Sequence, residues 1–377
     1  MKKERLRRGY TTGTCAQAAT KAAMQMLFSG KEVREVEVIL PKGERLKVEI
    51  SEIRMKFSEG GKVPVSVICA VKKDSGDDPD ITNGVFVYSK VERRKEQGIL
   101  LDGGIGIGRV TKPGLEQKIG EAAINRVPRM MIEKEVQDAC EEAEYLGGIF
   151  VEISIPKGVE LAKKTFNPRL GIEGGISILG TSGIVEPMSE QALLDTIRLE
   201  MKVRRAQGKE YLILAPGNYG VDFLQETYGI AEEDSVKCSN YIGQSLDMAV
   251  ELGFRGVVLT GHIGKLIKVS GGVMNTHSRW ADCRMELLAA AALRAGLGAE
   301  KACELLESFT TDDALEKVSE EERSRLMEQV MLKIESYLEY RVAGEMEVAS
   351  VVYSKVYGIL GKTKKADELM KKYGGSR

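Results

Sequence analysis

The sequence predicts an α+β N-terminal domain followed by an α/β doubly wound (Rossmann-like) domain with additional C-terminal helices. Segments of strand-like alternation outnumber helical segments before about residue 180, whereas short apolar strands alternate with helices afterwards. All nine prolines lie at or before Pro216, which indicates a loop-rich first part and a more regular second part. The 377 residues suffice for two domains, which we expect at 1–185 and 186–377.

The first predicted helix lies within residues 9–30, GYTTGTCAQAATKAAMQMLFSG. Thr14 with Gln17 has the spacing of a capping box, small apolar residues recur at helical period, and Gly30 is a natural stop. The entrance of such a helix can hold a carboxylate or phosphate and favours the thiolate of Cys15. A tightly packed, well-capped helix explains the same residues without a ligand, and on local evidence it is the better explanation.

Alternation then predicts a strand pair around the turn PKG, and later strands, at 33–40, 44–50, 63–73, 84–93 and 149–156. A helix is expected to start near Pro128.

The turn DSGDDPDITNG carries four carboxylates that could hold Mg²⁺, but an acidic turn whose carboxylates cap nearby N–H groups fits its Asp-Pro chemistry better. The glycine-rich stretches 98–114 and 171–187 look alike, either as a weak internal repeat or as two loops under similar constraints.

In the second half, a helix capped by Ser189 precedes the apolar strand YLILAP, and strands SVKCS, RGVVLTG and EVASVVYS alternate with further helices. One long helix is expected over THSRWADCRMELLAAAALRAGL. Ligands bind at the carboxyl ends of strands in such sheets. The loops APGNYG and TGHIGK follow two strands, although neither is a GxGxxG or P-loop motif. Their candidate cofactor-binding residues are Gly217, Asn218, Gly220, Thr260, Gly261 and His262.

Two further segments carry candidate chemistry. SGGVMNTHSRWAD contains His277 and Asp282, which serve either as acid–base groups or merely in the region that caps the next helix. LAKKTFNPRLG presents Lys163, Lys164 and Arg169 as an anion clamp for a polycarboxylate, or as an ordinary solvated basic turn.

Composition excludes several classes of function. Lys and Arg number 55 against 56 Asp and Glu, so no global field attracts nucleic acid or a membrane surface. The N-terminus shows no signal-peptide core and the chain no long apolar run, so a soluble cytoplasmic protein is expected. Six scattered cysteines without a CxxC pair and only two histidines predict reduced thiols and no metal site in the protein.

Taken together, these segments resemble the CbiD family. GYTTGTCA, KDSGDDPDITNG, GIGRVTKPGL, LAKKTFNPRLGIEGGISILGTSGIVEPMSEQA, APGNYG, KCSNYIGQSLDMA and GHIGKLIKVSGGVMNTHS follow one another in the family's order across about residues 5–290. The long central string is the most specific of them. Ala122 and Arg126 stand where the family pattern leads us to expect proline, which affects only the expected shape of that loop.

The resemblance implies S-adenosylmethionine-dependent methylation of ring carbon C1 of cobalt-precorrin-5B to cobalt-precorrin-6A in anaerobic cobalamin biosynthesis. The acceptor is a cobalt-bound tetrapyrrole with several carboxylates, and the cobalt arrives within it. The resemblance also raises Thr11, Thr12 and Thr14 to substrate-binding candidates beside the basic turn, and it makes His277 or water the acceptor of any ring proton. It leaves homo-oligomerisation open.

Two other classes of function fit parts of the sequence. A non-catalytic corrinoid carrier would share the anion-binding surface but would not bind S-adenosylmethionine. A nucleotide-dependent phosphotransferase would use DDPD for Mg²⁺ and GHIGK for phosphate, although the spacing before Lys265 does not match a P-loop.

Overall fold

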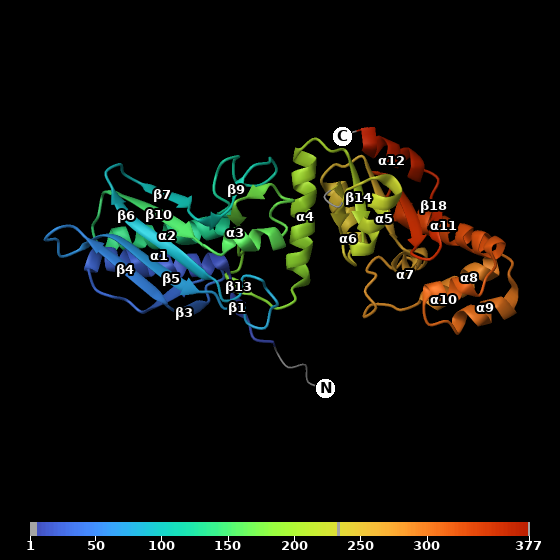
Figure 1. Ribbon diagram of the computed structural model, residues 1–377, viewed down its shortest axis with the longest axis horizontal. Coiled ribbons are helices and arrows are strands. Elements are labelled where there is room, and N and C mark those ends of the chain that lie inside the picture. The colour runs from blue at the N-terminus through green and yellow to red at the C-terminus, as the bar shows by residue number, and fades with distance from the viewer. Residues whose placement is uncertain (1–5, 232–233, 376–377) are drawn as a thin grey trace. The chain divides into compact units, whose positions relative to one another are not determined.

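The structure, a computed structural model, describes residues 6–231 and 234–375 and contains two compact units, Met1–Glu190 and Gln191–Arg377 (Figure 1). The domain boundary expected after residue 185 therefore falls after residue 190. Side chains of residues 218–222 lie outside the described part. Among the described helices, none has the length and apolar character needed to cross a bilayer.

The elements of the first unit, in chain order, are β1 (Gly9–Tyr10), α1 (Thr12–Ser29), β2 (Glu35–Ile39), β3 (Arg45–Glu49), β4 (Glu52–Phe57), β5 (Pro64–Lys72), β6 (Phe86–Arg94), β7 (Ile99–Gly103), β8 (Gly106–Ile107), β9 (Arg109–Val110), α2 (Arg126–Glu142), β10 (Gly148–Ser154), α3 (Gly158–Leu161), η1 (Ala162–Lys164), β11 (Ile172–Glu173), β12 (Gly175–Ile176) and β13 (Ile184–Val185).

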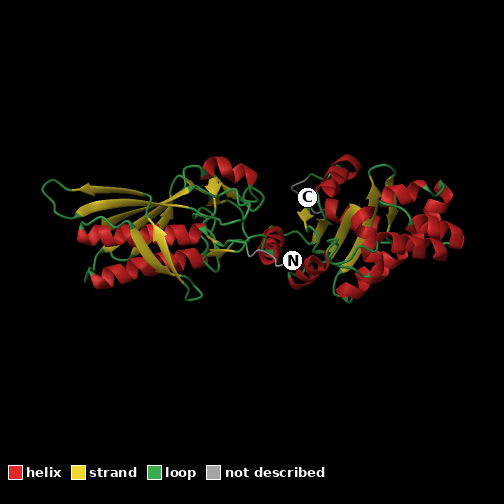
Figure 2. Cartoon of the chain, turned by 90° about the horizontal axis from the view of Figure 1, so that it is seen from below, coloured by secondary structure: helices red, strands yellow, loops and turns green. Residues whose placement is uncertain are grey.

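The main sheet of the first unit has the strand order β4-β5-β6-β10-β7, antiparallel except for the parallel pair of β10 with β7. Helix α1 packs against β5, β6, α2 and the β2–β3 hairpin, and its ribbon runs beside that of α2 in Figure 2. Neighbours on several sides bury α1 almost completely, which explains why its side chains are so small. Its stop is confirmed: Gly30 ends the helix at φ 68°.

Most predicted strands of this unit are confirmed, including the hairpin of β2 and β3 around PKG. Helix α2 begins at Arg126, two residues before the expected Pro128, which sits in its first turn. Strands β4 and β7 were not anticipated. Both have mixed burial patterns and lie at the two edges of the sheet, where one-sided alternation is weak.

The elements of the second unit are α4 (Glu190–Ala206), β14 (Tyr211–Ala215), α5 (Asn218–Tyr228), β15 (Val236–Lys237), α6 (Ile242–Glu251), β16 (Gly256–His262), α7 (Ile263–Leu266), η3 (Ile267–Gly271), α8 (Arg284–Arg294), α9 (Gly298–Leu306), α10 (Thr311–Glu316), α11 (Glu320–Val342), β17 (Glu347–Ser354), β18 (Gly358–Lys362) and α12 (Ala366–Gly375).

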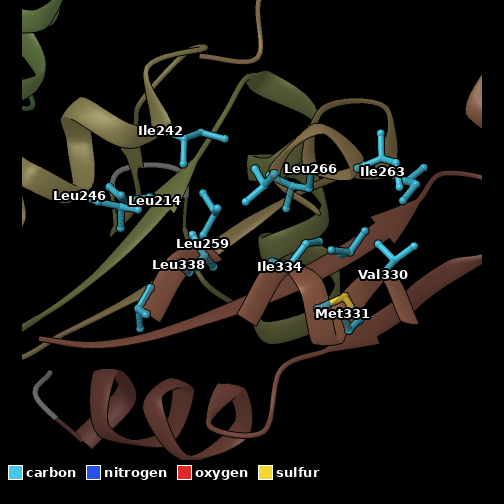
Figure 3. Packing of buried hydrophobic residues seen from close by; sticks show 14 of the residues in the cluster. Leu214, Ile242, Leu246, Leu259, Ile263, Leu266, Val330, Met331, Ile334 and Leu338 are labelled. Atoms are coloured by element: carbon cyan, nitrogen blue, oxygen red, sulfur yellow. The ribbon is translucent and has the colours of Figure 1, made fainter. Parts of the chain in front are cut away.

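The sheet of the second unit has the order β15-β14-β16-β17-β18, with the first four strands parallel and β18 antiparallel to β17. Alternate residues of β14 enter two separate cores. Ile213 packs with residues of α5 and α12, whereas Leu214 packs with α6, α7 and α11, as Figure 3 shows. Helices therefore cover both faces of this sheet.

The predicted long helix over residues 276–297 is wrong at its start. Residues 272–283 form a loop, and α8 begins only at Arg284. The loop is bonded to α6 and to η3 through Met274, Thr276 and Ala281, and these bonds outweigh the helical tendency of the segment.

Candidate functional site

The entrance of α1 is closed by its own chain. Thr11, not Thr14, is the N-cap: its hydroxyl accepts the backbone N–H of Thr14. The predicted capping box is thus wrong, because the hydroxyl of Thr14 donates instead to the carbonyl of Gly183 at 2.7 Å. Thr12 and the backbone N–H of Gly13 bond to Leu179. The three threonine hydroxyls expected to hold substrate are buried and satisfied within the protein.

Cys15, in the first turn of α1, is also closed off from solvent. The helix dipole predicts a favoured thiolate here, yet the side chain is completely buried. Burial raises the pKa of the Cys15 thiol to about 12, and the nearby charge of Lys73 only partly opposes this shift. The local prediction is therefore overturned by desolvation.

The acidic turn after β5 is a set of caps. Asp80 accepts from Lys73 at 2.5 Å and from the N–H and hydroxyl of Thr82, while Asp74 forms a two-pronged ion pair with Arg7. Within residues 6–231 and 234–375, no group of three or more His, Cys, Asp or Glu side chains could hold a metal ion. The capping interpretation of this turn is confirmed and the magnesium interpretation is not supported.

The two look-alike glycine-rich stretches lie against each other. β8 pairs in parallel with β12, and β9 pairs with β11. A Cβ placed on Gly106 would lie 1.7 Å from the carbonyl oxygen of Ile155, and one on Gly175 would lie 2.3 Å from the backbone of Gly106. These glycines allow backbone segments to touch each other, so that space is not open to a ligand.

The basic turn is presented at the surface. Lys163 and Lys164 are exposed on η1, and Arg169 is half-buried a few residues later. Asn167 fixes this turn, because its amide donates to the carbonyl of Gly175 and its oxygen accepts from the hydroxyl of Ser177.

In the second unit, Gly217 follows β14 and is the N-cap of α5. Its φ of 111° disfavours any side chain, and among the described residues a Cβ at this position would meet only the Nζ of Lys265, at 3.5 Å. Asn218 and Gly220 open α5, but their side-chain surroundings lie outside the described residues. The backbone at this strand end is therefore approachable, unlike that of Gly106.

Thr260 lies on β16 beside this point. Alternation places its side chain on the face of Val258, which packs with α5 and α12. The residue is fully buried, and its hydroxyl has no hydrogen-bond partner among the residues that the structure describes. A buried hydroxyl without a partner disfavours folding, which makes Thr260 a candidate contact for a bound group.

Lys265, in α7, supplies a positive charge at the same strand ends. The side chain is half-buried, and burial lowers the pKa of its ammonium, with the charge of Lys268 adding to the effect and Cys238 opposing it. Within the described part of the chain, no hydrogen bond or ion pair engages this ammonium. Such an unpaired cation suits a carboxylate brought by a ligand.

His262 and Gly261 have internal partners. The Nδ1 of His262 accepts the N–H of Gly264 at 3.1 Å and thereby caps α7, and its Nε2 lies 3.6 Å from Asp312. Burial lowers the pKa of His262, against the opposing charge of Asp312. A Cβ on Gly261 would meet Pro216 at 2.9 Å, so this glycine serves packing. Both residues shape the site.

His277 and Asp282 have separate partners. His277 is exposed, and its Nδ1 accepts the backbone N–H of Arg279 at 3.0 Å. Neutral His277 then carries its proton on Nε2, which makes this nitrogen a donor. Asp282 forms a two-pronged ion pair with Arg284, and this hydrogen bond lowers the pKa of the carboxyl.

The sequence interpretation missed the third strand end. Cys238 follows β15, and its N–H bonds to the carbonyl of Ala215 at the end of β14. Ser239 has a φ of 53°, and Asn240 contacts Thr276. The strand-end rule that selected APGNYG also applies to KCSN, but the short strand β15 gives too little periodicity to be weighted equally.

Comparisons with known proteins identify the family of this chain. Residues 1–187 match the family model described as CbiD, and residues 275–364 match the model described as CbiD, C-terminal domain. A cobalt-precorrin-5B C(1)-methyltransferase of Ruminiclostridium cellulolyticum is 47% identical over 93% of this chain and 90% of that protein. The protein of that name from Alkaliphilus metalliredigens is 43% identical, over 97% and 95%.

A crystal structure of the cobalamin biosynthesis protein cbiD from Archaeoglobus fulgidus is similar in sequence. It is 30% identical, covers 73% of this chain and 83% of its own, and gives a TM-score of 0.38.

Proposed function

The chain belongs to the CbiD family, and from that premise we propose that it methylates carbon C1 of cobalt-precorrin-5B in cobalamin biosynthesis. Relatives that carry this activity in their names align over nearly the whole chain, both units included. The acceptor is a cobalt-precorrin, and its cobalt enters as part of the substrate.

We propose S-adenosylmethionine as the methyl donor and the carboxyl ends of β14 and β16 as its site. The strand order reverses between these two strands, which in a doubly wound, Rossmann-like sheet is the place where ligands bind. Gly217 offers approachable backbone, Thr260 an unused buried hydroxyl and Lys265 an unpaired ammonium. This set fits a nucleoside that carries an amino-acid carboxylate. The unpaired charge of Lys265 is the observation that supports the site most strongly.

When bound, the donor supplies a sulfonium-activated methyl group, so no nucleophile or metal of the protein is required. The residues named here do the holding. Lys265 pairs with the donor carboxylate, Thr260 bonds a polar group of the donor, and His262 keeps α7 and thus Lys265 in place through its cap to Gly264. Restricting the position of both reactants lowers the entropic part of the barrier to this transfer.

For the acceptor, we propose that Lys163, Lys164 and Arg169 bind side-chain carboxylates of the tetrapyrrole. The threonines at the entrance of α1 act on the fold of that region instead. A proton released from the ring passes to water. His277, with its proton on Nε2, is suited to donate a hydrogen bond to the substrate.

The two alternative functions are less well supported. The phosphotransferase loses support for its magnesium site, because Asp74 and Asp80 are engaged in ion pairs with Arg7 and Lys73. A corrinoid carrier that does not bind S-adenosylmethionine would leave the unpaired ammonium of Lys265 at the strand end unexplained.

The test is a methyl-transfer assay. The purified protein with cobalt-precorrin-5B and S-adenosylmethionine should give a product heavier by one methylene unit, followed by mass spectrometry. Retention of the tetrapyrrole without any mass increase would favour the carrier.

The donor site is tested by Lys265→Met, with exposed Lys371→Met on α12 as the matched control. Loss of one charged hydrogen bond should weaken S-adenosylhomocysteine binding by about tenfold or more in calorimetry. The control should bind like the wild type. Equal affinity of Lys265→Met and wild type would refute this placement of the donor.

A further inference from the structure

The loop of residues 272–283, between η3 and α8, is held by a buried lysine. Lys268 is only 3% exposed, and its ammonium donates to the carbonyl of Thr276 at 3.1 Å and to that of Ala281 at 2.8 Å. One charged group thus ties together both ends of the segment 277–280. Charge-assisted hydrogen bonds of this kind are stronger than neutral ones, so the segment has a defined shape.

A second set of bonds fixes the loop to the edge of the sheet that carries the proposed donor site. Thr276 donates its N–H to the carbonyl of Asn240, and the N–H of Gly243 bonds to Met274. Asn240 lies two residues after Cys238, whose N–H bonds to the end of β14. The loop is therefore anchored beside the ends of β14 and β15.

The segment displays large polar and aromatic side chains to solvent. Residues 277–280 are all exposed, and Trp280, the one tryptophan of the chain, is 64% exposed. The backbone is ordered beneath them: Arg279 bonds to His277 Nδ1 and Trp280 to the His277 carbonyl. The guanidinium of Arg279 has no ion-pair partner within the described ranges. An indole and a guanidinium that stay in solvent contribute little to the stability of the fold. Their exposure on an ordered loop therefore needs another explanation.

We propose that this loop is the platform on which the flat tetrapyrrole lies, with Trp280 stacked against the macrocycle and Arg279 paired with one of its carboxylates. The proposal rests on the function given above. Methyl transfer needs the accepting carbon within contact of the donor, so a surface for the macrocycle must lie beside the donor site. An aromatic plane suits a flat conjugated ring, and a guanidinium suits a carboxylate.

The first experiment measures Kd and KM for cobalt-precorrin-5B in Trp280→Ala and Trp280→Phe. Stacking losses on alanine substitution predict an increase of about tenfold in Trp280→Ala. Trp280→Phe should recover most of the affinity, and S-adenosylhomocysteine binding should stay unchanged in both. Tyr340→Ala, at an 85% exposed aromatic of the same unit, is the control. Wild-type KM in Trp280→Ala would overturn the platform.

The second experiment uses the single tryptophan as a probe. Acrylamide should quench the fluorescence of the free protein readily and that of the protein saturated with cobalt-precorrin-5B much less. Shielding of Trp280 already in the free protein would overturn the proposal, since another surface or a second copy would then cover it. Full accessibility at saturation would overturn it as well.

The two proposals fail differently. A wild-type protein that transfers methyl groups while Trp280 stays accessible disproves the platform alone. A protein that shields Trp280 on binding the tetrapyrrole but transfers no methyl group disproves the proposed function and leaves the platform standing.

Discussion

The glycine- and threonine-rich segments of the first unit and the strand-end loops of the second unit are alike in sequence and opposite in structure. In the first unit, the Cβ position of Gly106 is occupied by the carbonyl of Ile155, and the hydroxyl of Thr14 is used by Gly183. Among the described residues of the second unit, the Cβ position of Gly217 meets only the end of Lys265, and the hydroxyl of Thr260 has no hydrogen-bond partner.

Small residues therefore have two uses that cannot be told apart from the local sequence. A glycine can let two backbones of the same chain touch, or it can leave backbone open to a ligand. Polar groups separate the two cases: the hydroxyls of Thr12 and Thr14 in the first unit have partners within the chain, whereas Thr260 and Lys265 have none among the described residues.

The largest expected effect comes from Gly106→Ala against Gly217→Ala. The first substitution places a methyl group on a carbonyl at a φ of 80° and should destabilise the first unit by about 4 kcal/mol or more. Gly217→Ala adds backbone strain of about 1–3 kcal/mol in the second unit, leaves the stability of the first unit unchanged and weakens binding of the donor. Urea unfolding with limited proteolysis of each unit measures both. Wild-type stability of the first unit in Gly106→Ala would contradict the proposed difference between the two glycines.

Thr14→Val tests the closed helix entrance. The change removes the buried hydroxyl that donates to the carbonyl of Gly183, which keeps the backbone N–H of Thr11 as a donor, so a loss of about 0.5–1.5 kcal/mol in the free energy of unfolding is expected. The KM for cobalt-precorrin-5B should not change. Thr196→Val, at a hydroxyl that donates to the carbonyl of Ala192 within α4, is the control for stability. A raised KM with normal stability would return Thr14 to the substrate site.

Thr260→Val should change the free energy of unfolding in the opposite direction from Thr14→Val. Removal of an unsatisfied buried hydroxyl keeps the stability of the fold or raises it, by up to about 1 kcal/mol, while donor binding weakens several-fold. Ser245→Ala is the matched control, because Ser245 is also buried without a partner in the described chain but lies in α6, whose core is on the other face of the sheet. Weakened donor binding in both variants would argue against a specific role of Thr260.

The smallest expected effect is the inertness of Cys15. With a pKa of about 12, only roughly one thousandth of this thiol is ionised at pH 9, and the buried sulfur is shielded from reagents as well. Iodoacetamide at pH 8–9 should label exposed Cys303 and leave Cys15 unmodified, as read by peptide mass spectrometry. Comparable labelling of the two would support the dipole-based prediction of a reactive thiol.

Several features of this protein follow from short, periodic patterns in its sequence. The stop of α1 at Gly30, the hairpin of β2 and β3, the buried strand β14 and the order of the family's motifs all depend on residues close together in the chain. The rule that ligands bind at strand ends selects Gly217 and Thr260 from the sequence, and the strands that carry them, β14 and β16, pair directly in the sheet.

Which polar groups remain available for a ligand depends on contacts between segments that are far apart in the sequence. Thr14 meets Gly183 across 169 positions, and Thr12 meets Leu179 across 167, so no local pattern reveals that the entrance of α1 is closed. Residues 272–283 form a loop because Lys268 and Asn240 bond to it. Burial reverses the dipole effect on Cys15. Desolvation and long-range hydrogen bonding depend on how distant segments pack, and they exceed the local preferences that a sequence displays.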